Sequence, residues 1–589
     1  MMKIEDAKKR KFYIVCFVII WVVQMVAAFY FCTLKQGFHE DEYYTYYSTA
    51  RTNGFYVEDG QWMDQETYRN EFVVLAGQQF QYGLVKQVQS WDVHPPVYYW
   101  VFHTVASMVP GVFSKWIGLS VNLFFHGINI ILLTYLSYLV SDRCKMVALI
   151  VTLFYGLTPA AVSGVVFIRM YEMLTMWVLL CALLHVRAVK KREEKLQEEK
   201  LSLKGFLLPI ALVTYLGFLT QYYYFIFLFF MGVAFCIYLL WRDRSIGNCL
   251  RYGISQITAF VLAYLTYPSC LGQMFRGQRG AQATENFMDL SNTAERLRFF
   301  YDLLDEYVFG KMLTWLLLLA VILVVTVYAM AGRRRLSGRD SSKQNSQSSV
   351  LRESKQTATR RKGKADIAFW LLMAAVIGYF LTVSKTALLL GDTSNRYQLP
   401  VYGMIVLLLF DGIYRLGKQC ILVSDTSVAS GLLSGEERTE ASARKAMSKM
   451  PGYLGAAAVV ICLLVDLSGL AGGRVVFLYP EDKQQAAFAK ERAEAGTPVV
   501  YVYQTGAEWC IWDVTNELLE YPAVYFVSAD SEDLIEDDRI AEAKDLVVYL
   551  ADGVDSEEQL SRITAKAMYL KDRPQLLFEE KYCDVYYVR

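Results

Sequence analysis

The chain has 589 residues, 54% of them hydrophobic, with a formal net charge of +1 and a mean hydropathy of +0.25. These values exclude an ordinary water-soluble globular protein, and the near-zero net charge gives no sign of a nucleic-acid partner. Repeated apolar runs of about 20 residues predict a polytopic α-helical membrane protein, whereas a membrane β-barrel would show ~10-residue alternating strands.

The apolar runs predict about eleven membrane spans. They cover residues 12–34, 114–140, 145–161, 169–188, 205–221, 222–241, 252–270, 311–331, 367–388, 397–417 and 452–472. Basic residues precede the first run and no small-residue cleavage site follows it, which predicts an uncleaved transmembrane helix. The lysines and arginines of the connections alternate between the two sides, which predicts a multi-pass protein of the cell membrane with a cytoplasmic N-terminus. The extracytoplasmic parts are then 35–95, 271–310, 388–396 and everything after 473.

Composition predicts two domains, a transmembrane domain at 1–472 and a small extracytoplasmic α/β domain at 473–589. Residues 332–365 are rich in basic residues, Ser and Gln, which predicts a flexible basic cytoplasmic loop. After residue 473, short apolar strands alternate with helical stretches. The expected strands are 498–504, 523–528, 546–550, 576–578 and 585–588. Two cysteines in this part, Cys510 and Cys583, either form a disulfide or remain free buried thiols.

Three consecutive carboxylates, Glu40, Asp41 and Glu42, follow the first apolar run. At a membrane boundary such groups are costly unless they are solvated, paired or used in function. A solvated acidic turn is the simpler interpretation, but the neighbouring Phe38 and tyrosines are an unusual composition for a free loop. Because a carboxylate in a partly dry setting suits a general base, Asp41 and Glu42 are candidate catalytic residues.

A second motif, Asp92-x-His94-Pro95-Pro96, precedes an apolar segment that ends near Pro110. The segment is too short to span a bilayer, so we expect an interfacial helix that begins at the two prolines. His94 is the only ionisable group between the loop and this helix, and Asp92 is placed to orient its imidazole. A lone histidine is more often structural than functional, and the residues alone leave both roles open.

Arginines mark the outer ends of two predicted spans, at Arg169 and Arg396. Each also fits a side chain that snorkels to the membrane interface, but two guanidinium groups on one face suit phosphate oxygens. Arg276 and Arg279, in the long 271–310 loop, are weaker candidates for the same anion site. The tyrosines beginning at Tyr222 most simply anchor a helix at the interface, with a contact to sugar or lipid as the alternative.

In this order along the chain, the motifs resemble the GT-C superfamily of glycosyltransferases that use polyprenyl-phosphate sugars. The likeness is to bacterial glycosyltransferase family 39, the protein O-mannosyltransferases and the lipid A aminoarabinose transferase. It covers roughly residues 1–420. The matching pieces are Asp41-Glu42, Asp92-x-His94-Pro95-Pro96-x-Tyr98-Tyr99, Arg169-x-Tyr171, Tyr222–Phe225 and Arg396-Tyr397-x-x-Pro400.

The resemblance implies a GT-C-type fold and an inverting sugar transfer at the extracytoplasmic face. An acid matched by Asp41 would activate an acceptor hydroxyl, which attacks the anomeric carbon of the lipid-linked sugar. Side chains on the leaving lipid phosphate would be His94, Arg169, Arg396 and Tyr397. The remaining expected substrate contacts are Asp92, Tyr98, Tyr171, Tyr223 and Arg279.

Several points stay open at this stage. The base is one of Glu40, Asp41 and Glu42, and the acceptor is a lipid, a polysaccharide or a protein. Relatives differ in metal dependence, and the sequence holds no recognisable metal cage, so a divalent cation is left open. Two other functions remain, a lipid or sugar transporter, for which no internal repeat is seen, and a non-catalytic scaffold for the C-terminal domain.

Overall fold

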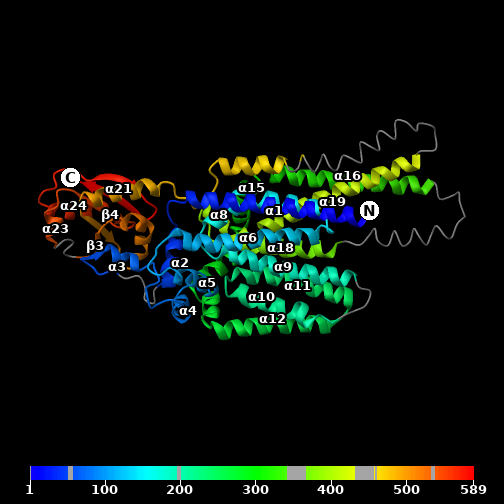
Figure 1. The fold of residues 1–589 in the computed structure, drawn as a ribbon, viewed down its shortest axis with the longest axis horizontal. Helices are drawn as coiled ribbons and strands as arrows, with labels where there is room; N and C mark the ends of the chain where they lie inside the picture. The colour runs from blue at the N-terminus through cyan, green and yellow to red at the C-terminus, as the bar shows by residue number, and fades with distance from the viewer. Residues whose placement is uncertain are drawn as a thin grey trace.

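The computed structural model describes residues 2–50, 57–194, 200–340, 366–431, 457, 460–531 and 537–589. Its helices form an elongated bundle, and the C-terminal sheet lies beyond one end of that bundle (Figure 1). The N-terminus lies toward the opposite end. The predicted basic loop at 332–365 lies largely outside the described residues, as do residues 452–456 of the last predicted span.

Six helices in the described ranges are long and apolar enough to cross a membrane, by length and composition. They are α1 (Met2–Leu34), α6 (Lys115–Val140), α9 (Tyr171–Glu194), α11 (Tyr223–Asp243), α18 (Ile367–Thr386) and α19 (Leu399–Gly431). The prediction of a multi-pass helical membrane protein is therefore confirmed.

Two further pairs of helices pass the same test only together, because each pair is bent. The first joins α7 (Lys145–Gly156) to α8 (Pro159–Val166) at 57°, and Thr158 caps α8 by accepting from the Ala161 N–H at 3.2 Å. In the second, a 103° bend follows α12 (Ile246–Thr266) at Pro268, before α13 (Ser269–Phe275) and α14 (Gln278–Met288). A proline lacks the N–H that would continue the helix, which accounts for this break.

The remaining predicted spans fall on shorter apolar helices, at Leu203–Phe218, Leu313–Ala329 and Val460–Ala471. The first contains η1 (Leu203–Leu207) and α10 (Leu208–Phe218), and the second is the apolar part of α16 (Leu313–Asp340). By length and composition, six helices in the described ranges qualify as spans, or eight if each bent pair is one span, and the other three expected spans coincide with these shorter apolar stretches.

Short helices from the segment after α1 lie at the end of the bundle that is nearest the sheet, except α3, which lies beside the sheet (Figure 1). They are α2 (Glu40–Ala50), α3 (Gln65–Asn70), α4 (Tyr82–Trp91) and α5 (Val97–Ser107). The short helix expected after Pro95 and Pro96 is confirmed as α5. Its Tyr98, Tyr99 and Phe102 side chains are fully buried and belong to the core. The helix α5 packs against α2.

A six-stranded sheet of order β1-β3-β2-β4-β6-β5 forms the C-terminal part. Its strands are β1 (Gln61–Asp64), β2 (Val499–Tyr503), β3 (Ala523–Ser528), β4 (Leu546–Ala551), β5 (Gln575–Glu579) and β6 (Cys583–Val588). Strands β3, β2 and β4 are parallel, and every residue of β2 and β4 is buried, as in a sheet covered on both faces. The helices of this part include α21 (Asp482–Glu494), η4 (Glu508–Val514), α22 (Thr515–Leu518) and α24 (Ser556–Lys566).

The edge strand β1 comes from the first outer segment and pairs antiparallel with β3. Its Trp62 donates a hydrogen bond to Asp537 at 2.8 Å. The sheet is therefore not built by residues 473–589 alone, because the outer segment completes it. Cys510 and Cys583 are both buried and both free, so the structure favours the thiol alternative.

Candidate functional site

The acidic motif forms the first turn of α2, where carboxylates interact favourably with the positive end of the helix dipole. The Glu42 side chain accepts a hydrogen bond from the His39 backbone N–H at 2.7 Å, a reciprocal cap of the helix start. Because consecutive helical residues are about 100° apart, Glu40, Asp41 and Glu42 point in different directions. The three acids therefore have three different environments.

Glu42 is fully buried and serves the structure. It forms an ion pair of 2.9 Å with the equally buried Lys35 Nζ and accepts from the Ile168 N–H at 2.6 Å. Burial raises the pKa of Glu42, while Lys35 and the Ile168 and His39 amides oppose that rise. Since both of its oxygens are engaged and it lies away from any opening, the expectation that Glu42 is catalytic is not supported by this geometry.

Asp41 lines a pocket of about 260 Å³ at the outer end of the bundle. We call it the arginine pocket after Arg169, Arg279 and Arg396, which also line it. The structure brings the following sequence-predicted residues together in its wall: Asp41, His94, Arg169, Tyr171, Tyr223, Arg279, Arg396 and Tyr397. They come from α2, the segment before α5, the α8–α9 link, α11, α14 and η3 (Thr393–Tyr397).

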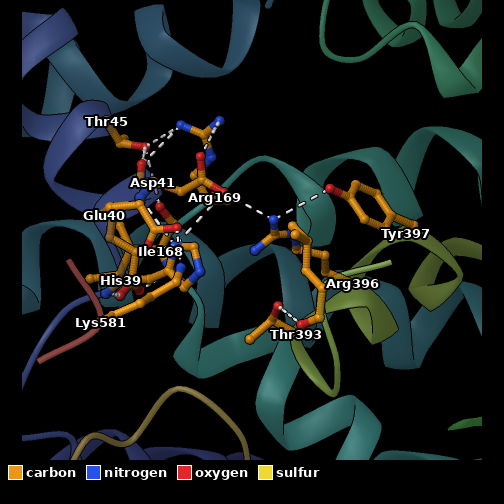
Figure 2. Close-up of polar contacts among 12 residues, drawn as sticks. His39, Glu40, Asp41, Thr45, Ile168, Arg169, Thr393, Arg396, Tyr397 and Lys581 are labelled. Carbon is orange, nitrogen blue, oxygen red and sulfur yellow. Dashed lines mark hydrogen bonds and ion pairs between the residues drawn. The ribbon is translucent and has the colours of Figure 1, made fainter. Parts of the chain in front are cut away.

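The Asp41 carboxylate lies between two guanidinium groups (Figure 2). Its Oδ2 is 3.2 Å from Arg396 Nη2, and its Oδ1 is 3.7 Å from Arg169 Nη2. About a third of the side chain, 34%, is exposed to the pocket. Burial by itself would raise the pKa of Asp41, but Arg169 and Arg396 outweigh it and hold that pKa well below its usual range. Asp41 is therefore ionised and accessible.

Arg169 is held rigidly, with only 2% of its side chain exposed. Its Nη1 donates to the Asp41 carbonyl at 3.0 Å and to Thr45 Oγ1 at 3.1 Å. Its Nη2 lies 3.3 Å from His94 Nε2. These contacts fix the guanidinium plane against α2.

Arg396 is the less satisfied of the two arginines. Its Nη2 lies near Asp41 and donates to Tyr397 Oη at 3.3 Å. Its Nε and Nη1 are buried and have no hydrogen-bond partner among the described residues. Buried polar groups are normally paired, so Arg396 has unused hydrogen-bonding capacity at a place where its side chain lines the pocket, which indicates a site for an anion.

His94 and Asp92 form a pair at the edge of the pocket. His94 Nδ1 lies 2.9 Å from Asp92 Oδ2, while Arg169 approaches Nε2 from the other side. Because Arg169 can only donate, the ring proton belongs on Nδ1, where it is donated to Asp92. Asp92 thus orients the imidazole but does not line the pocket. Tyr98 also lies outside the pocket, fully buried in the core, so the structure does not support its expected contact with substrate.

Two important residues escaped the sequence analysis. Lys35 directly follows the first apolar run, where a lysine commonly marks the end of a membrane helix. Its ion pair with Glu42 depends on the turn between α1 and α2. Gln273, on α13, lines the pocket and donates from Nε2 to the Asp92 carbonyl at 2.5 Å, which anchors the 92–94 segment. An uncharged amide in a long loop carries no signal in a single sequence. Among the described residues, no group of three or more His, Cys, Asp or Glu side chains is arranged to hold a metal ion.

Comparison with protein-family models finds no match, and comparison with curated proteins finds none either. The fold is similar to that of ArnT from Cupriavidus metallidurans bound to undecaprenyl phosphate, with a TM-score of 0.51, 11% identity and 98% of each chain covered. Apo ArnT from the same organism gives a TM-score of 0.42 at 13% identity, covering 96% of this chain and 97% of that one.

A third similar structure is the oligosaccharyltransferase AglB from Archaeoglobus fulgidus in complex with an inhibitory peptide and a dolichol-phosphate. It gives a TM-score of 0.40 at 11% identity and covers 95% of this chain and 71% of that one. Of these three structures, undecaprenyl-phosphate-bound ArnT has a TM-score above 0.5, and at 11% identity the likeness bears on the fold alone. The expected fold, a polytopic α-helical bundle with a small C-terminal α/β part, is thereby confirmed as similar to that of ArnT.

Proposed function

We propose that this protein is an integral-membrane glycosyltransferase that moves a sugar from a polyprenyl-phosphate donor to an acceptor hydroxyl. The reaction takes place at the extracytoplasmic face, in the arginine pocket. The observation that carries the proposal is the ionised Asp41 between Arg396 and Arg169 in the wall of one pocket, with two N–H groups of the buried Arg396 left unpaired. The ArnT structure of the same fold, which contains undecaprenyl phosphate, supports the choice of donor.

The lipid phosphate binds to Arg396, whose guanidinium carries a permanent positive charge and keeps unpaired N–H donors for phosphate oxygens. Arg169 and Arg279 add positive charge on the other walls of the pocket. His94 lies in the same wall, and its Nε2 contacts Arg169 Nη2 at 3.3 Å, which helps to keep Arg169 in place. Tyr171, Tyr223 and Tyr397 give the pocket an aromatic wall that suits the sugar and the start of the lipid chain.

Asp41 accepts the proton of the acceptor hydroxyl. The oxygen of that hydroxyl forms a bond to the anomeric carbon while the bond from that carbon to the phosphate oxygen breaks. The bonding electrons leave with the phosphate, where the arginines stabilise the developing charge. Attack from the face opposite the leaving group inverts the configuration.

Donor binding also prepares the base. In the free protein both guanidinium groups act on Asp41, so its proton affinity is low. A bound phosphate shares those positive charges and adds a negative one, which raises the proton affinity of Asp41. The carboxylate thus becomes a better base when the donor is in place.

The test uses purified protein in lipid with a panel of radiolabelled polyprenyl-phosphate sugars and follows release of polyprenyl phosphate. We expect release with one sugar, and a loss of about 10²–10⁴-fold in rate for Asp41→Asn, the range for removal of a general base. Glu66→Gln, an exposed acid at the start of α3, is the matched control and should be unaffected. Wild-type rates in Asp41→Asn would contradict the catalytic assignment.

A further inference from the structure

A second pocket lies where the bundle meets the C-terminal sheet, and we call it the junction pocket. Its volume is about 610 Å³. The carboxyl groups that line it are Glu40, Glu481, Asp482, Asp513, Glu579 and Glu580. Lys581 is the only lysine or arginine of this lining, and its Nζ is already paired with Glu40 at 2.6 Å. Among the described residues, the junction pocket therefore has a large excess of acid over base.

These carboxyl groups are crowded and partly removed from water. Burial raises the pKa of Asp482 to about 7, with Glu481 and Glu580 adding to the rise. Burial and the neighbouring Asp513 likewise raise the pKa of Glu580 to about 7. Like charges held together in this way are stabilised by a positive charge placed among them.

Two buried polar groups in the wall have no partner. Asp482 is only 9% exposed, and its carboxylate forms no hydrogen bond or ion pair with any described residue. Gln485 is 8% exposed, and its Oε1 is buried and unpaired although its Nε2 donates to Glu580. Both groups are acceptors on the first turn of α21, so the ligand that completes them is a donor of hydrogen bonds.

The junction pocket and the arginine pocket are lined by neighbouring residues of the same two segments. His39 and Glu40 line the former, and the next residue, Asp41, lines the latter. His39 Nδ1 lies 3.8 Å from Asp41 Oδ2. On the link between α18 and α19, Leu388 lines the arginine pocket while Leu390 and Thr393 line the junction pocket. A molecule in the junction pocket is therefore next to the proposed base.

We propose that the junction pocket binds a primary ammonium group of the acceptor and thereby presents the acceptor hydroxyl to Asp41. The proposal rests on the proposed glycosyltransferase function and adds the chemical class of its acceptor, an amine-bearing alcohol. An ammonium group supplies the positive charge that the crowded carboxyl groups lack and three hydrogen-bond donors, which can complete the unpaired Asp482 carboxylate and Gln485 Oε1. An organic cation fits better than a metal ion, since among the described residues no three acids are arranged to hold one.

The test measures binding of dansylcadaverine, a fluorescent primary amine, to the full-length protein in detergent, with neutral dansylamide as the comparison. We expect saturable binding of the amine and none of the neutral probe. Asp482→Asn/Glu580→Gln should raise the dissociation constant by at least about tenfold, the equivalent of one charge-assisted hydrogen bond. Gln485→Lys, which supplies an ammonium group from the wall itself, should block the probe. Glu542→Gln, an exposed acid of the same part of the chain, is the control.

Binding of undecaprenyl phosphate is measured on the same preparations. Retained lipid binding by the variants shows that they are folded and separates this inference from the proposed function. If the wild-type protein binds the lipid but not the amine, or if both variants bind the amine like the wild type, the ammonium site is wrong while the enzyme proposal stands. If Mg²⁺ displaces the probe at lower concentration than n-propylamine does, the site is for a metal ion and the acceptor assignment is overturned.

Discussion

The arginine pocket and the junction pocket lie on either side of the first turn of α2 and carry opposite charge. One holds three arginines around a single accessible carboxylate, and the other holds six carboxyl groups around a single lysine. Glu40 faces the junction pocket, Asp41 faces the arginine pocket, and Glu42 faces the core. One short acidic motif, placed on a helix, thus separates a pocket lined by arginines from a pocket lined by carboxyl groups, while its third residue anchors the helix to the core.

The largest effect is expected from breaking the scaffold that keeps the pockets apart. Lys35 pairs with Glu42 and also donates to the Phe477 carbonyl at 2.7 Å, while Glu42 binds the Ile168 amide. Lys35→Met leaves a buried carboxylate unpaired and should lower the free energy of unfolding by about 3–5 kcal/mol. Thermal unfolding in detergent measures the change.

Lys581→Met is the matched control for that experiment, since it removes the half-exposed partner of Glu40 and should cost less than about 1 kcal/mol. The double variant Lys35→Met/Glu42→Gln should recover part of the loss. Equal effects of the two lysine variants would show that the buried pair does not anchor α2.

A smaller effect is expected from the carboxyl groups of the junction pocket, which make the stability of the protein depend on pH. A carboxyl whose pKa is raised by folding favours the folded state at low pH, and this contribution is lost as the pH rises through about 7, as for Asp482 and Glu580. The groups around them are Glu481, Asp513, Lys35 and Lys581. Each tenfold change in proton affinity corresponds to about 1.4 kcal/mol.

The unfolding temperature of the wild type should therefore fall between about pH 4 and about pH 7, and that of Asp482→Asn/Glu580→Gln should fall less. Above pH 7 the double variant should be the more stable protein. A steeper fall in the variant would mean that these carboxyls are favourably ionised in the folded state, contrary to this account of the junction pocket.

The helical bundle and the C-terminal α/β part could be predicted from the sequence, because long apolar runs indicate membrane helices and short apolar segments between helical stretches indicate strands. The five strands after residue 473 were predicted nearly to their ends, whereas β1 was not, since four residues of an edge strand hold no period. The arginines and tyrosines of the arginine pocket were found from their place at the outer ends of spans. The separate roles of Asp41 and Glu42 were not, because they depend on α2 being a helix in a segment that was expected to be a loop. Lys35 and Gln273 act through partners far away in sequence, which no local pattern reveals.

The most direct test of the account is the affinity for undecaprenyl phosphate of the wild type, Arg396→Gln and Asp41→Asn, measured side by side. Arg396→Gln should bind at least about 100-fold more weakly, because charge-assisted hydrogen bonds to the phosphate are lost. Asp41→Asn should bind as tightly as the wild type or more tightly, since a negative charge next to the phosphate is removed, while sugar transfer is lost. Undiminished binding by Arg396→Gln, or a comparable loss of binding in Asp41→Asn, would contradict the division of the arginine pocket into a phosphate site and a base.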